Sequence, residues 1–245
     1  MKLLFKINPN YLLFHSLAQA RGVFPFKEWN KLLLNLWQKS KEVFYFLGGY
    51  PEVALYLKRI SDFKELSEKT IKILNQIKRT KEYQRLLKET EDYKKFVEKQ
   101  WKRNEKKVFS ILEELLGRKL PSKKIYVYIT HPKLKNGKVI DKNIIVWGHS
   151  EDFPNYATVY LCHEIMHLLT DLDRSKITHA VIELMIDNEL RIRLNGKGRY
   201  FQFPGHKDLE ELERKILPYW KKYLKSPKKD FFEFLKNLKK TLKRN

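Results

Sequence analysis

Apolar residues recur at intervals of three and four through most of the first 120 residues. One face of an α-helix repeats every 3.6 residues, so this spacing predicts helices over residues 26–47, 51–63, 67–87 and 93–116. Gly48-Gly49 and Gly117 follow two of these stretches, and glycine commonly ends helices. The pattern therefore predicts an almost wholly helical region over residues 1–120.

The spacing changes after Pro121. Residues 124–130 are β-branched and aromatic, and residues 143–147 form a second apolar run, so both are predicted to be strands. Asn136-Gly137 between them is a typical turn sequence. Helical spacing then returns at residues 160–170, 178–195, 208–224 and from 230 onward.

These patterns predict a predominantly α-helical α+β protein. At 245 residues the chain can form one large domain or two small ones. The expected organisation is a helical region over residues 1–120, a core with strands over 121–207, and C-terminal helices over 208–245 that pack on the core.

One of the predicted helices carries the sequence motif HExxH, formed by His163, Glu164 and His167. Residues four apart lie on one face of a helix, a single turn apart, so the two imidazoles can bind one metal ion together. Glu164 projects beside that ion, where its carboxylate can take a proton from a water that the metal activates. This combination is typical of a hydrolase.

The next helix offers a third metal ligand. Residues 178–195 follow the motif helix after a short polar connection, so the two helices are expected to be antiparallel. At a rise of about 1.5 Å per residue, Glu183 lies level with His167. Asp187 shares the face of Glu183 and lies level with His163, where a carboxylate can orient the imidazole. Glu189 points to another side of the helix and is the poorer candidate.

HExxH followed by a helix with Glu-x-x-x-Asp resembles the gluzincin branch of zinc metallopeptidases, including thermolysin-like and compact minigluzincin cores. The resemblance implies a Zn²⁺ ion held by His163, His167 and Glu183. It implies Glu164 as general base and Asp187 as the partner of His163.

The resemblance has further consequences for the fold and the site. It implies a zincin-like core in which a small antiparallel sheet packs on the motif helix, and an edge strand over residues 144–148 that pairs with a peptide substrate. Gluzincins also commonly place a tyrosine or histidine after the third ligand to hold the developing oxyanion, and Tyr200 and His206 are the candidates. The interval between His167 and the third ligand is shorter than in the better-known gluzincins, which keeps Glu189 and His179 open as alternative ligands.

The chain is strongly basic, with 51 Lys and Arg residues against 29 Asp and Glu residues and a formal net charge of +22. Such a charge attracts polyanions, so the alternative function is a helical nucleic-acid-binding protein with a structural or inactive zinc site. The same composition is typical of the charged surface of a thermophile's protein. The basic residues are spread along the helices without a recognisable binding motif.

Cellular location follows from what the sequence lacks. No run approaches the roughly 20 apolar residues that span a bilayer, and Lys6 and Pro9 interrupt the apolar start before a signal peptide forms. The single cysteine, Cys162, agrees with a reducing compartment and is expected to fill the core. We therefore expect a cytoplasmic zinc metallopeptidase, either active or kept latent by the flanking helices.

Overall fold

The computed structural model describes residues 1–19, 51–64, 66–203 and 205–242. These residues form a mainly helical α+β fold with one four-stranded sheet, as the sequence predicts at the level of fold class. The helix predicted over residues 26–47 lies outside the described residues.

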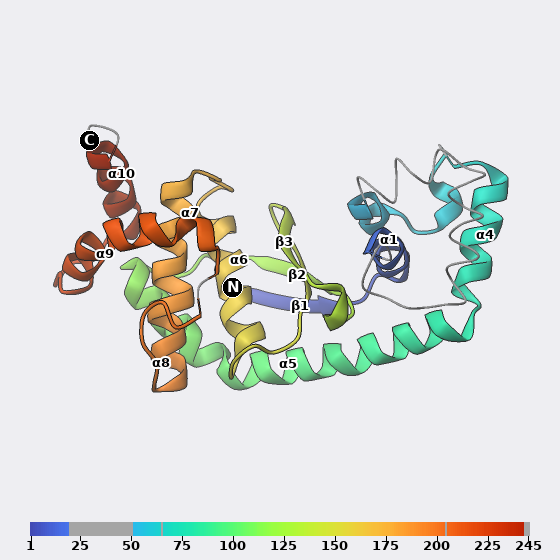
Figure 1. The fold of residues 1–245 in the computed structure, drawn as a ribbon, viewed down its shortest axis with the longest axis horizontal. Coiled ribbons are helices and arrows are strands. Elements are labelled where there is room, and N and C mark those ends of the chain that lie inside the picture. Colours follow the sequence, from blue (N-terminus) through green and yellow to red (C-terminus); the bar gives the residue numbers. More distant parts are fainter. Residues whose placement is uncertain (20–50, 65, 204, 243–245) are drawn as a thin grey trace.

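A long helix, α5 (Lys81–Leu116), runs along the molecule. Helices α1 (Pro9–Gln19) and α4 (Glu68–Lys78) lie at one end of it, and the C-terminal helices lie at the other (Figure 1). The helix boundaries differ from the predicted ones, because one helix ends and the next begins between α4 and α5. There the Thr80 hydroxyl caps α5 by accepting a hydrogen bond from the backbone N–H of Tyr83. Two short 3₁₀ segments, η1 (Pro51–Tyr56) and η2 (Ile60–Asp62), precede α4.

The sheet is mixed, which corrects the predicted antiparallel sheet. Its strands are β1 (Lys2–Lys6), β2 (Lys124–Ile129), β3 (Asn136–Asp141) and β4 (Ile144–Gly148), in the order β1-β2-β4-β3. Strands β1 and β4 both run parallel to β2, and only β3 and β4 are antiparallel. Because β1 pairs with a strand more than 100 residues away, local spacing could not reveal it, and the first residues are a strand rather than part of a helical region.

The edge strand next to the motif helix is β3, which corrects the prediction that residues 144–148 form that edge. Strand β4 lies inside the sheet, between β2 and β3. Asn136-Gly137, predicted as a turn, begins β3, and the turn falls at Lys142-Asn143 instead. A 3₁₀ segment, η3 (Pro132–Leu134), connects β2 to β3.

The motif helix is α6 (Tyr156–Leu169), and after a short turn the chain returns through one continuous helix. That helix consists of α7 (Lys176–Glu183), a π-helical segment η4 (Leu184–Leu190) and α8 (Arg191–Asn195). It ends at Gly196 with a positive φ, as predicted. The segment η5 (Lys207–Leu209) and helices α9 (Glu210–Leu224) and α10 (Phe231–Leu242) complete the described chain.

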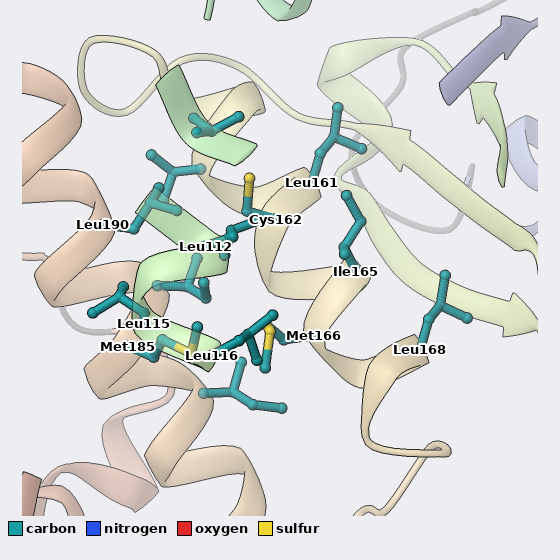
Figure 2. Close-up of a cluster of buried hydrophobic side chains, with 14 of the residues drawn as sticks. Leu112, Leu115, Leu116, Leu161, Cys162, Ile165, Met166, Leu168, Met185 and Leu190 are labelled. Atoms are coloured by element: carbon teal, nitrogen blue, oxygen red, sulfur yellow. The ribbon is translucent and has the colours of Figure 1, made fainter. Parts of the chain in front are cut away.

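The apolar face of α6 is buried against α5 and the returning helix. In Figure 2, Cys162 and Met166 point toward these two helices, whereas Leu161, Ile165 and Leu168 point to the other side of α6, toward the sheet. Cys162 is fully buried among these side chains, as expected for a core residue. The side chains labelled in the figure are Leu112, Leu115 and Leu116 of α5, Leu161, Cys162, Ile165, Met166 and Leu168 of α6, and Met185 and Leu190 of the returning helix.

Polar side chains of α5 hold the start of α6 in place. Gln100 accepts hydrogen bonds from the backbone N–H and hydroxyl of Thr158, both at 2.9 Å, and Asn104 donates to Asn155 at 2.8 Å. Glu151 accepts from the backbone N–H groups of residues 156 and 157. The first-turn donors of α6 are thus paired, and the start of the motif helix is held against α5. No helix in the described part of the chain is long and apolar enough to cross a membrane.

Two glycines that end helices provide a matched test of the packing. Gly117 and Gly196 both have φ near +70°, but a Cβ on Gly117 would lie 1.9 Å from the carbonyl oxygen of Lys229, whereas one on Gly196 would meet nothing within 4 Å. We expect Gly196→Ala to cost about 1 kcal/mol of the free energy of unfolding, the usual cost of a left-handed alanine. Gly117→Ala should reduce the free energy of unfolding by clearly more, because the backbone at Lys229 must also move. Urea unfolding of both variants measures the difference, and equal losses would contradict the packing of the C-terminal segment on α5.

Candidate metal centre

The two histidines of the motif face each other across one turn of α6. His163 and Glu164 are buried, with exposed fractions of 3% and 4%, and His167 is partly exposed. The Nε2 atoms of His163 and His167 lie 3.1 Å apart. The predicted helical spacing therefore brings both imidazole nitrogens to one point.

The returning helix orients the first of these rings. The Nδ1 of His163 donates to Oδ2 of Asp187 at 2.6 Å, so the Nε2 atom is the one that faces His167. Burial lowers the pKa of His163, but the charge and hydrogen bond of Asp187 outweigh burial and raise it to about 9. Asp187 thus lies where the sequence placed it, level with His163.

This contact leads to a direct prediction. Asp187→Asn removes the charge that holds His163, so zinc affinity should fall by about 10- to 100-fold, the usual effect of losing a carboxylate behind a ligand histidine. Competition with a chromophoric chelator measures it. Asp171→Asn, on the exposed turn after α6 with a φ of 53° that asparagine also adopts, is the control and should leave affinity unchanged. Equal affinities in both variants would show that Asp187 does not support a ligand.

Two further potential ligands lie one turn apart on α7, His179 and Glu183. Nitrogen atoms of His163, His167 and His179 all lie within 4.8 Å of one another. Ligand atoms of His179, Glu183 and His206 form a second group of the same size. His179 belongs to both groups, so it is His179 that lies with the two motif histidines, whereas Glu183 is grouped with His179 and His206.

The Glu183 carboxylate is 1% exposed and already paired with protein groups. His206 donates to Oε1 through Nδ1 at 2.5 Å and to Oε2 through its backbone N–H at 3.3 Å. Burial opposes ionisation of Glu183, but hydrogen bonds from His206 and Glu213 keep its pKa below the usual value. A Cβ on Gly205 would lie 3.0 Å from the carboxyl carbon of Glu183, so a larger residue there would press on this carboxylate.

The donor atoms fit a divalent metal ion. Burial lowers the pKa of His167 to about 3 and that of His179 to about 4, so both rings are neutral at pH 7 and have a lone pair to offer. The Nε2 atom of His179 is buried and has no hydrogen-bond partner in the described part of the chain. Imidazoles next to a buried carboxylate are the ligand types that Zn²⁺ prefers. His163, whose pKa is raised to about 9, must release a proton when an ion binds.

Glu164 lies beside this cluster with its carboxylate held by the edge strand. It accepts a hydrogen bond from the backbone of Val139 in β3, and burial raises its pKa above the usual value of a glutamate. A carboxylate with a raised pKa is a stronger base, which suits a group that must accept a proton.

Two of the residues considered from the sequence lie away from the cluster. The Tyr200 hydroxyl donates to Glu189 and accepts from Nε1 of Trp220 at 3.1 Å. Glu189 also pairs with Arg193 at 2.7 Å. The structure therefore brings His206, and not Tyr200 or Glu189, to the motif histidines.

Two cavities flank His163 and share part of their lining. The larger has a volume of about 640 Å³, and the smaller, of about 300 Å³, is lined by Glu164, His167 and His179. Aromatic rings dominate the larger cavity. These are Trp147, His149, Phe153, Tyr156, Tyr160 and Phe203.

Glu213, which contacts Glu183, was not among the residues predicted from the sequence. It lies on α9 with an exposed fraction of 2%, hydrogen-bonds Glu183, and has its pKa raised to about 9 by burial and by the charge of Glu183. A signal existed: Leu209, Glu213, Ile216 and Trp220 form one buried stripe, and a carboxylate on an apolar stripe is unusual.

Comparison with known proteins gives no family assignment. No protein-family model matches the chain, and neither a curated protein nor a solved structure matches it significantly.

Proposed function

We propose that the protein is a zinc-dependent metallopeptidase of the gluzincin type, with a zincin-like core made of the sheet, α6 and the helix of residues 176–195. The observation that carries the proposal is the arrangement around His163. Its Nε2 atom meets that of His167, its Nδ1 atom is held by Asp187, and the buried Glu164 lies in the same cavity. This arrangement supports catalysis at a metal more than a purely structural site, because the cluster borders a cavity.

We propose that His163, His167 and Glu183 would hold the Zn²⁺ ion. His179, whose ligand atom lies within 4.8 Å of those of both motif histidines, is the alternative third ligand. A bound Zn²⁺ ion supplies Lewis acidity, which polarises a carbonyl group and makes water a better nucleophile at neutral pH. The His206–Glu183 hydrogen bond orients the carboxylate from its other side.

Glu164 is proposed to move the proton. Its carboxylate accepts a proton from the attacking water and passes it to the leaving amine, while the Val139 N–H keeps it oriented. Since this N–H reaches Glu164, β3 presents its outer edge to the cavity, and we propose that a peptide pairs with β3 there.

The direct test is peptide hydrolysis by the full chain loaded with zinc. We expect cleavage of short fluorogenic peptides, loss of cleavage with a chelator, and recovery when zinc is added back. Activity that appears only after limited proteolysis would identify a latent enzyme. Zinc bound at one ion per chain without hydrolysis before or after proteolysis would contradict the proposal.

A further inference from the structure

Tyr160 lies on α6 directly beside the proposed metal ligands. It precedes His163 by one helical turn, and the two rings stack with centroids 5.5 Å apart and planes 19° apart. On another side its ring packs on Trp147 of β4, with centroids 4.6 Å apart. The ring is therefore held in one orientation by two neighbours.

The hydroxyl end of this ring reaches the edge strand. A Cβ on Gly137 of β3 would lie 2.9 Å from Cε1 of Tyr160, the ring carbon next to the one that carries the hydroxyl. Gly137 and Tyr160 line both cavities that flank His163. The phenol thus stands between the cavities, where a peptide lying along β3 would pass the motif residues.

The Tyr160 hydroxyl has no hydrogen-bond partner within residues 1–19, 51–64, 66–203 and 205–242. The sequence-based candidate Tyr200 is different, because its hydroxyl is already bonded to Glu189 and Trp220. A phenol is a neutral donor at pH 7. Tyr160 is therefore free to donate a hydrogen bond to a ligand in the cavity.

We propose that Tyr160 is a catalytic residue whose hydroxyl donates a hydrogen bond to the carbonyl oxygen of the scissile peptide bond as that oxygen gains negative charge. The inference rests on the proposed peptidase function. The water oxygen forms a bond to the carbonyl carbon, its proton passes through Glu164 to the amine nitrogen, and the C–N bond breaks. The O–H bond of Tyr160 stays intact throughout, so its contribution is electrostatic.

The test is Tyr160→Phe, which keeps the ring and removes only the hydroxyl. We expect kcat to fall by about 100- to 1000-fold, as for loss of one oxyanion donor, with KM and zinc content little changed. Gly137→Ala is the second variant: its Cβ would push the phenol away from β3, so kcat should fall there as well. Tyr219→Phe, an exposed tyrosine of α9, is the matched control and should behave as the wild type.

A binding readout separates this role from a structural one. A phosphinic peptide imitates the tetrahedral state, whereas an ordinary peptide bound to the Glu164→Gln protein imitates the ground state. Tyr160→Phe should weaken phosphinic peptide binding by roughly 100-fold and ordinary peptide binding only slightly. An active wild type with an unchanged Tyr160→Phe variant, or equal losses for both ligands, would overturn the role of Tyr160 alone. A zinc-loaded wild type that neither cleaves peptides nor binds the phosphinic peptide would overturn the proposed function and this inference with it.

Discussion

Glu164→Gln should reduce peptide hydrolysis by about 10²- to 10⁴-fold, the usual contribution of a general acid–base group, while zinc binding is retained. The substitution is nearly isosteric, and an amide oxygen can still accept the hydrogen bond from Val139. The amide cannot take a proton from water, so the chemical step is lost without disturbing α6. Initial rates with fluorogenic peptides and zinc content by elemental analysis measure the two effects on one sample.

The control is Glu211→Gln on α9, where the side chain is 83% exposed and pairs with Lys215. This variant should keep both zinc and activity. Full hydrolytic activity in zinc-loaded Glu164→Gln protein would show that another group accepts the proton, and the mechanism proposed for this site would be wrong.

Glu183→Gln should weaken zinc binding by more than the roughly 100-fold limit that is typical for residues that only orient a ligand. Glu183 is expected to be the third ligand because it lies one turn before Asp187 on the same face of the helix, and Asp187 contacts His163. Glu189→Gln should leave zinc binding unchanged, because Arg193 and Tyr200 hold that carboxylate away from the cluster. Competition with a chromophoric chelator ranks the variants.

His179→Gln provides the discriminating comparison, because the His179 ring lies 3.6 Å from the Glu183 carboxylate and within reach of both motif histidines. We expect a smaller loss of affinity for this variant than for Glu183→Gln. The reverse order would identify three histidines as the ligands and would leave Glu183 as the residue that holds His206.

The C-terminal helices contribute directly to the site. Glu213 of α9 hydrogen-bonds Glu183, and Lys239 of α10 pairs with Asp173 in the turn after α6. The turn between α6 and α7, and the Glu183 carboxylate, are therefore contacted by residues far along the chain. A core limited to residues 121–207 would lack both contacts.

Local spacing was sufficient for the helices that carry the candidate site. HExxH positions are one helical turn apart wherever the helix forms, and a short polar connection returns the chain alongside it, so the pairing of His163 with Asp187 follows from 3.6 residues per turn. The predominantly helical α+β class and the burial of Cys162 follow from the same spacing of apolar residues.

The tertiary structure decided what depends on contacts between distant segments. Strand order cannot be read from a local pattern, because β1 and β2 are joined by more than 100 residues, and so the edge strand proved to be β3 rather than residues 144–148. The surroundings of single side chains were equally hidden: Tyr200 is bonded to Glu189, His206 reaches Glu183, and Tyr160 stands at the edge strand with a free hydroxyl among the residues described. Helical periodicity assigns a residue to a face, whereas only packing against other elements decides which group that face meets.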